Sequence, residues 1–173
     1  MKSETMDLHK KHTPPDIKCG IITLSDSRSN SKEGENLDTS GKYIINLLKE
    51  KNCKIVQYNI IPDKKEELIS TIKEMNEKTC DVIFTNGGTG LESKDITIET
   101  VKTLYEKEIN GFGEIFRAKS YEELGSGALL SRASAGVYNK TIIFSMPGSP
   151  NAVKTAMSII IDEIGHLVKH TQK

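Results

Sequence analysis

The segment that most constrains the fold is an apolar, β-branched run that leads directly into a glycine turn and then into a helical pattern. Residues 81–84 read Asp-Val-Ile-Phe, residues 87–90 read Gly-Gly-Thr-Gly, and a helical pattern begins near Ile98. Glycine has no Cβ to keep a ligand at a distance, and it reaches positive φ freely. A strand, turn and helix in this order expose backbone N–H groups to an anion. The sequence therefore predicts an anion-binding loop at the end of a buried strand.

Strand-like runs alternate with helical patterns along the rest of the chain. Strands are predicted over 19–25, 53–61, 82–85, 135–138 and 141–146, and helices over 41–51, 64–78, 98–105 and 150–168. Thr39 or Ser40 is expected to cap the first helix. Alternation of this kind predicts an α/β fold, a three-layer α/β/α single domain with a mostly parallel sheet.

Three stretches are predicted to be less regular. Residues 26–39 read as a polar loop, and residues 106–108 as a solvated helix face. Residues 111–134 read as helical in parts, with breaks at glycines 111, 113, 125 and 127. The polar residues 1–16 are predicted to be a flexible N-terminal tail, so the α/β domain spans 17–173.

Composition excludes several classes of protein. Among the 173 residues, Lys plus Arg equals Asp plus Glu at 24 each, and aromatic residues make up only 5%. The chain therefore has neither a basic field nor a stacking platform for nucleic acid. No apolar run approaches the roughly 20 residues of a membrane span. Cys19, Cys53 and Cys80 are widely spaced and are expected to be buried free thiols, which favours a cytoplasmic location.

The unusual segments all follow predicted strands. Ser25-Asp26 follows the first, Pro62-Asp63 the second, the glycine loop the third, and residues 147–151, Pro-Gly-Ser-Pro-Asn, the last. In open parallel sheets, ligands collect at the carboxyl ends of the strands, where the strand order reverses. We therefore expect these four segments to form one site.

Asp63 and Asp95 are the predicted catalytic residues. Two phosphoryl groups repel each other, and bringing them together requires a metal or several fixed donors. Mg²⁺ prefers one or two carboxylates together with phosphate oxygens and water, so two aspartates on neighbouring loops suit it. The alternatives are an ordinary turn or helix cap for Asp63, and a cap or first-turn charge of the next helix for Asp95.

Further candidates surround these carboxylates. The glycine loop lacks the spacing of a P-loop or of a dinucleotide fingerprint, so a plain tight turn is its alternative. Ser149 with Pro150 makes a second anion-friendly helix start, for which ordinary capping is the alternative. Arg132 could face an anion, or lie exposed on an amphipathic helix. The predicted substrate-binding and nucleotide-binding residues are Ser25, Asp26, Asn86, Gly87, Gly88, Thr89, Gly90, Lys94, Ser131, Arg132, Pro147, Gly148, Ser149, Pro150 and Asn151.

Taken in order, these segments resemble a known family, the molybdenum cofactor biosynthesis proteins of the MoaB/MogA type. The resemblance covers about Cys19 to His170, and residues 37–41 and 163–167 look closer to the B-type members. The matching motifs are Leu-Ser-Asp-Ser-Arg at 24–28, Ile-Pro-Asp at 61–63, Thr-Asn-Gly-Gly-Thr-Gly at 85–90, Lys-Asp-Ile-Thr at 94–97, Gly-Phe-Gly-Glu at 111–114, Leu-Ser-Arg-Ala at 130–133 and Met-Pro-Gly-Ser-Pro-Asn-Ala-Val at 146–153.

The resemblance implies a three-layer α/β fold, a homotrimer or hexamer, and binding of molybdopterin. The implied reaction is adenylylation, in which the terminal phosphate of molybdopterin attacks the α-phosphorus of ATP with Mg²⁺ present and pyrophosphate leaves. Asp63 and Asp95 match the aspartates that are essential in active members. Other proteins of the molybdenum cofactor pathway are the implied partners.

The chain departs from the family pattern in three places. Asn86 replaces a usual Thr, and Ile98 replaces a frequent Pro. Glu92-Ser93-Lys94 replaces a more apolar, Pro-Arg-like segment. Lys94 keeps the positive charge but loses the bidentate fork of arginine, and Glu92 adds a negative charge near an expected polyphosphate. These departures leave open a non-catalytic molybdopterin carrier or assembly protein, and the glycine turn alone would also suit a nucleotide pyrophosphatase on a related fold.

Overall fold

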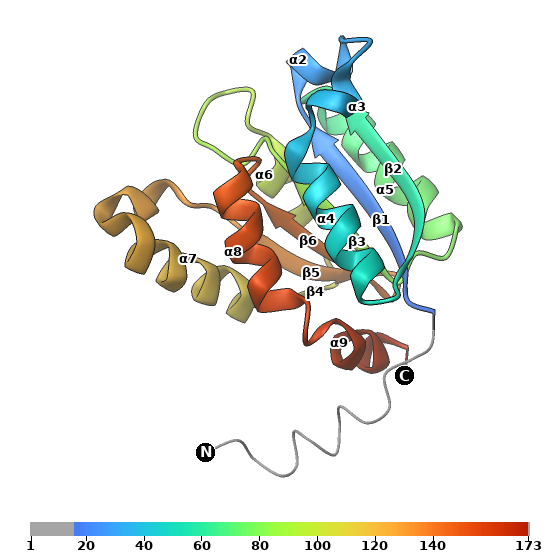
Figure 1. Ribbon diagram of the computed structural model, residues 1–173. Coiled ribbons are helices and arrows are strands. Elements are labelled where there is room, and N and C mark those ends of the chain that lie inside the picture. Colours follow the sequence, from blue (N-terminus) through green and yellow to red (C-terminus); the bar gives the residue numbers. More distant parts are fainter. Residues whose placement is uncertain (1–15, 173) are drawn as a thin grey trace, which may run out of the picture.

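In the computed structural model, which describes residues 16–172, six strands form one sheet in the order β2-β1-β3-β6-β5-β4 (Figure 1). Strands β2, β1, β3 and β6 run parallel, and β5 and β4 are antiparallel to their neighbours. The strands are β1 (Lys18–Leu24), β2 (Lys54–Ile61), β3 (Val82–Asn86), β4 (Lys107–Glu108), β5 (Ser134–Tyr138) and β6 (Thr141–Met146). The mostly parallel sheet confirms the predicted fold class.

Helices cover both faces of the sheet (Figure 1). One face carries α4 (Thr39–Glu50), α7 (Asn110–Leu124), α8 (Pro150–Ile160) and α9 (Ile164–Thr171). The other carries α5 (Lys65–Glu77) and α6 (Thr97–Lys102). The short elements are α2 (Asp26–Ser29), α3 (Gly34–Leu37) and the 3₁₀ helix η1 (Gly125–Leu130).

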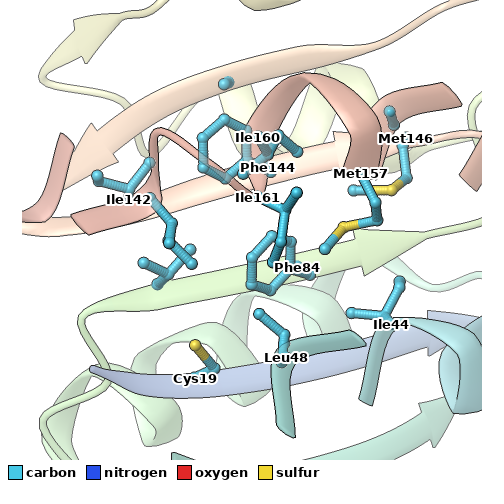
Figure 2. Packing of buried hydrophobic residues seen from close by; sticks show 14 of the residues in the cluster. Cys19, Ile44, Leu48, Phe84, Ile142, Phe144, Met146, Met157, Ile160 and Ile161 are labelled. Atoms are coloured by element: carbon cyan, nitrogen blue, oxygen red, sulfur yellow. The ribbon is translucent and has the colours of Figure 1, made fainter. Parts of the chain in front are cut away.

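The larger core cluster lies between the sheet and the layer of α4 and α8 (Figure 2). Phe84 of β3 stacks on Phe144 of β6 with ring centroids 5.8 Å apart, and Phe112 of α7 meets Phe144 edge-on at 5.1 Å. Leu48 of α4 and Met157 of α8 close over these rings. Because both faces of the sheet are covered, its central strands read as continuous apolar runs.

The path of the chain places a switch point between β1 and β3. The chain starts in β1, moves outward to β2 at the edge of the sheet, and then crosses back to β3 on the other side of β1. The loops that follow β1 and β3 therefore leave the same edge of the sheet side by side. Crevices at such points are where doubly wound sheets bind ligands.

Two predictions in the first half of the chain and one in the last helix are wrong. The loop over 26–39 contains the single-turn helices α2 and α3. Asp38, and not Thr39 or Ser40, caps α4, because its side chain accepts a hydrogen bond from the Gly41 N–H. The predicted helix over 150–168 is two helices separated at residues 161–163.

Residues 106–114 also differ from prediction. Residues 107–108 form β4 and pair with β5, so they are not a helix face. Gly111 and Gly113 do not interrupt α7. A Cβ on Gly113 would lie 2.8 Å from the Ala133 carbonyl oxygen, so this glycine lets the helix approach the start of β5. Gly125, with φ of 59°, does end α7 as predicted.

The remaining sequence predictions concern the thiols, the tail and the membrane. The three cysteines are free and buried, as predicted. The predicted tail over 1–16 lies outside the described residues except for Asp16. No described helix combines the length and the apolar character needed to cross a membrane.

Candidate functional site

Two aspartates join the loops that follow β1 and β2. The Asp26 N–H donates to Asp63 Oδ2 at 3.1 Å, and the Asp63 N–H donates to Asp26 Oδ1 at 3.0 Å. Beside this pair, the Ser25 N–H donates to the Ile61 carbonyl at 2.9 Å. The reciprocal bonds hold Asp63, the first predicted catalytic residue, in a defined position at the carboxyl edge of the sheet.

The second oxygen of Asp63 faces the glycine turn. Asp63 Oδ1 is buried and has no hydrogen-bond partner among the described residues. A Cβ on Gly88 would lie 2.7 Å from this atom and 2.6 Å from Thr97 Oγ1, so only glycine fits there. A buried carboxylate oxygen without a donor is costly, and a bound cation or donor removes that cost. The geometry therefore fits a ligand between Asp63 and the turn.

Asp95 lies on the other side of the same turn. Its Oδ2 accepts a hydrogen bond from the Glu92 N–H at 2.9 Å. A Cβ on Gly90 would lie 2.6 Å from that oxygen, so Asp95 folds back over Gly90. Both predicted catalytic carboxylates thus contact the glycine loop.

The surroundings of Asp63 disfavour its charged form. Burial raises the pKa of Asp63, and the hydrogen bond from the Asp26 N–H opposes that effect. The negative charges of Asp26 and Asp95 raise the pKa further, while Lys94 lowers it. A carboxylate held near like charges is a place where a cation binds favourably.

We expect the Asp63 pKa in the metal-free protein to lie above the ordinary aspartate value and to fall in the Asp26→Asn variant. The asparagine keeps an oxygen for the Asp63 N–H but removes one like charge. Because the folded-state pKa is raised, the folded protein holds the proton more tightly than the unfolded chain. Asp63 therefore lowers stability as pH rises from about 4 through its folded pKa. Carbon-detected NMR titration of the side-chain carboxyl measures both values, and an unchanged pKa in Asp26→Asn would contradict the assigned cause.

The glycine turn is packed against the loops that follow β1 and β6. Gly87 has φ of 96°, and a Cβ there would lie 2.3 Å from the Leu24 carbonyl oxygen. The Gly87 N–H donates to the Met146 carbonyl at 3.1 Å. A Cβ on Gly148 would lie 3.1 Å from the Gly87 Cα. The structure thus brings the Pro-Gly-Ser-Pro segment and the glycine turn into backbone contact.

Ser149 caps α8, the alternative that the sequence left open. Its side chain accepts a hydrogen bond from the Ala152 N–H at 3.3 Å, and Pro150 occupies the first helical turn. A cavity of about 270 Å³ opens beside this helix start, and Ser131, Pro147, Ser149 and Asn151 are among its lining residues. These four predicted binding residues therefore share one cavity.

The two predicted cations of the site both have protein partners. Arg132 lies between η1 and β5, not on a helix; its guanidinium donates to the Gly90 carbonyl at 2.9 Å and pairs with Glu99. The bond to Gly90 thus supports the glycine loop. Lys94 pairs with Glu92 at 3.0 Å on the exposed tip of the loop. The negative charge that Glu92 adds to this loop is thus paired with the positive charge of Lys94.

Asn86, one of the predicted binding residues, directs its side-chain amide into the sheet. The residue is 1% exposed, and its amide nitrogen donates to Thr23 Oγ1 at 2.8 Å. Because the amide is used between β3 and β1, Asn86 supports the glycine turn from inside the sheet.

Sequence reasoning gave no role to Asp38, which is fully buried beneath the site. Its carboxylate accepts hydrogen bonds from Thr23 Oγ1 at 2.5 Å, Tyr58 OH at 2.7 Å and the Gly41 N–H at 2.9 Å. Burial and the bond to Asp38 raise the pKa of Tyr58. Ser40 Oγ in the same turn donates to the Gly148 carbonyl at 2.8 Å. One turn therefore holds the ends of β1 and β2 and the loop after β6. The only sequence signal for this role of Asp38 was an aspartate three residues before a glycine at a helix start.

No three His, Cys, Asp or Glu side chains converge as a metal-binding group within the described residues. A Mg²⁺ ion needs only one or two carboxylates when phosphate oxygens and water complete its shell. The unpartnered oxygen of Asp63, with Asp95 across the turn, fits that smaller requirement.

The fold and these loops define a class of protein: a doubly wound α/β domain whose candidate site lies at the topological switch point. A family model described as "Probable molybdopterin binding domain" matches residues 20–166. The chain belongs to this family.

Named relatives agree with this assignment. The "Molybdopterin adenylyltransferase" of Pyrococcus furiosus is 45% identical over 169 residues, which cover 95% of this chain and 97% of the relative. The "Molybdenum cofactor biosynthesis protein B" of Bacillus cereus is 44% identical over 162 residues, covering 92% and 93%. The crystal structure of the "tungsten cofactor synthesizing protein MoaB" from Pyrococcus furiosus has a TM-score of 0.84 at 44% identity, covering 92% of this chain and 99% of that one. The predicted family is thus confirmed.

Proposed function

We propose that this protein is a molybdopterin adenylyltransferase that transfers AMP from ATP to the terminal phosphate of molybdopterin. Family membership and the 45% identical relative named for this activity support the proposal. The observation that carries it is the buried, unpartnered Asp63 Oδ1 against the glycine turn, with Asp95 on the other side of that turn. This arrangement offers carboxylates and backbone N–H groups to two anionic groups at once.

The chemistry assigned to each group follows from its position. An oxygen of the molybdopterin phosphate forms a bond to the α-phosphorus of ATP while the bond to the bridging oxygen breaks, and pyrophosphate leaves. The glycine turn at 87–90 would bind and orient phosphate oxygens. Asp63 and Asp95 would hold Mg²⁺, which when bound neutralises phosphate charge. Ser131 and the helix start at Ser149 would hold the second substrate in the neighbouring cavity.

Transfer of labelled AMP tests this function. We expect incubation with molybdopterin and Mg-ATP labelled at the α-phosphate to yield adenylyl-molybdopterin and pyrophosphate. Molybdopterin binding without label transfer would favour the carrier or assembly protein, the alternative that Glu92 and Lys94 raise. Hydrolysis of a nucleotide without any pterin would instead favour a pyrophosphatase.

We also propose that the chain forms a homo-oligomer, a trimer or hexamer, through the surface of α7 and η1. The sequence showed no interface stripe, but Tyr121, Leu124, Leu129 and Leu130 of this surface are each at least 62% exposed. Exposed apolar patches of this kind mark interaction surfaces. The family resemblance also supports this proposal, in which a second copy of the chain packs against the patch.

Leu129→Glu is expected to shift the protein to monomers in size-exclusion chromatography with light scattering. The substitution puts a charge at the most exposed apolar residue, 85% exposed, without touching the core. Exposed Lys73→Glu on α5 is the matched control. An unchanged oligomer in Leu129→Glu, or a wild-type monomer, would contradict the assignment.

We further propose that the protein acts in the cytoplasm with other proteins of the molybdenum cofactor pathway. The three unpaired cysteines suit a reducing compartment, and ATP is the proposed co-substrate.

A further inference from the structure

A second polar cavity lies outside the site described above. The single-turn helices α2 and α3 and the outer edge of β2 enclose about 420 Å³, and Arg28, Lys32, Asn36 and Asn59 are among the lining residues. Figure 1 shows α2 and α3 beside the ends of β1 and β2, at the edge of the sheet that carries Asp63. None of the roles proposed above for adenylyl transfer involves a residue that lines this cavity.

Two cations of this cavity have no side-chain partner in the part of the chain that the structure describes. Across residues 16–172, neither the Arg28 guanidinium nor the Lys32 ammonium makes an ion pair or a side-chain hydrogen bond. Arg132 and Lys94 at the neighbouring glycine loop are paired, with Glu99 and Glu92. Unpaired guanidinium and ammonium groups facing one cavity supply charge and several N–H donors for an anion.

The rest of the lining adds further donors. Asn59 Oδ1 already accepts from Gln57 at 2.7 Å, which leaves its amide N–H groups available. The Tyr58 hydroxyl donates to Asp38 and so does not compete as an acceptor. β2 is the edge strand of the sheet, so its outward backbone N–H and C=O groups have no strand partner within residues 16–172. Glu35 is the one carboxylate among the lining residues, and the balance of groups favours a multiply charged anion.

Two of the segments that line the cavity lead along the backbone to the reaction centre. Arg28 follows two residues after Asp26, and Ile60, which lines the cavity, comes three residues before Asp63. The bonds between Asp26 and Asp63 join these two segments. At about 3.3 Å per residue, the near end of the cavity lies roughly 10 Å along the chain from Asp63. A ligand whose reacting phosphorus lies at Asp63 and the glycine turn can therefore extend its far end toward Arg28.

We propose that this cavity binds the β- and γ-phosphates of ATP, the part that leaves as pyrophosphate, through Arg28 and Lys32. The inference rests on the proposed adenylyl transfer, and it assigns a binding site to the phosphate end of the ATP that reacts. When the bond between the α-phosphorus and the bridging oxygen breaks, the electron pair and negative charge pass to that oxygen of pyrophosphate. Cations fixed near this group stabilise the charge that develops there.

Kinetics of Arg28→Gln and Lys32→Gln, with Lys73→Gln as an exposed control on α5, test the proposal. We expect each cavity variant to raise KM for ATP about tenfold and to weaken product inhibition by pyrophosphate to a similar extent, with an unchanged Kd for molybdopterin. Arg28→Lys, which keeps the charge, should recover part of the loss. KM for ATP within twofold of wild type in both Gln variants would overturn the proposal. A rise in the Kd for molybdopterin alone would also overturn it, because the anion would then be the phosphate of the pterin.

Direct titration separates this inference from the proposed function. Inorganic pyrophosphate, measured by isothermal titration calorimetry, should bind wild type and bind at least fivefold more weakly to both Gln variants. If wild type transfers no AMP but this difference is seen, the function is wrong and the pyrophosphate site stands. If wild type transfers AMP and pyrophosphate binding does not depend on Arg28 or Lys32, the function stands and this inference is wrong.

Discussion

Asp63→Asn is expected to lower the rate of adenylyl transfer by about three orders of magnitude, with Asp95→Asn causing a loss of similar size. Removing one charge-stabilising group from a transfer site costs about 10²–10³-fold in rate. Asp63 Oδ1, which has no hydrogen-bond donor among residues 16–172, would become part of a neutral amide that binds a divalent cation poorly. Single-turnover transfer of labelled AMP at saturating Mg-ATP measures the loss, and fluorescence titration with molybdopterin should give a Kd within threefold of wild type.

The loss in Asp63→Asn should occur without unfolding. Since the pKa of Asp63 is raised by burial and by like charges, its ionised form destabilises the folded state at neutral pH. The asparagine variant should therefore unfold at the same temperature as wild type or at a higher one. Asp162→Asn, whose side chain is 69% exposed and pairs with Lys51, is the matched control and should change neither rate nor stability appreciably. Full turnover in both Asp63→Asn and Asp95→Asn would show that the assigned roles are wrong.

Gly87→Ala is expected to have the second largest effect, because it combines backbone strain with a collision. The residue has φ of 96°, and the added Cβ would lie 2.3 Å from the Leu24 carbonyl oxygen, a backbone atom of a central strand. A left-handed conformation alone costs a side-chain-bearing residue about 1–2 kcal/mol. We expect an unfolding free energy lower by at least about 2 kcal/mol, measured by urea denaturation. The rate of transfer should fall about 10²-fold, because a shift of the turn by about 1 Å displaces the reacting groups.

Gly125→Ala separates the collision from the strain. Gly125 also has positive φ, 59°, but nothing lies within 4 Å of a Cβ built there. This variant should lose about 1 kcal/mol of stability and keep the wild-type rate of transfer. Suppose instead that Gly87→Ala and Gly125→Ala lost the same stability and both kept full activity. The packing of the glycine turn against β1 would then not be needed for adenylyl transfer.

The layer architecture was predictable because it depends on local patterns. Apolar runs such as 82–84 and the stripe over 64–78 identify buried strands and an amphipathic helix without any knowledge of their partners. The convergence of Asp63, Gly88 and Gly148 followed from one rule, that the carboxyl ends of parallel strands share an edge. Errors arose where short or glycine-containing segments depend on tertiary neighbours, as in α7, which runs through Gly113 because β5 lies close beside it.

The sequence by itself determined the alternation of strands and helices, the glycine turn and the presence of a carboxylate in each of two loops that follow parallel strands, since each is written in adjacent residues or in a fixed period. Only the tertiary structure decided which polar groups are already used within the protein. Asn86 donates into the sheet, Arg132 is paired with Glu99, and Asp38 links β1 to β2 through Thr23 and Tyr58, whereas one oxygen of Asp63 has no hydrogen-bond partner within residues 16–172. Hydrogen bonds and ion pairs between residues tens of positions apart depend on the register of the packed strands, and no local pattern in the chain encodes them.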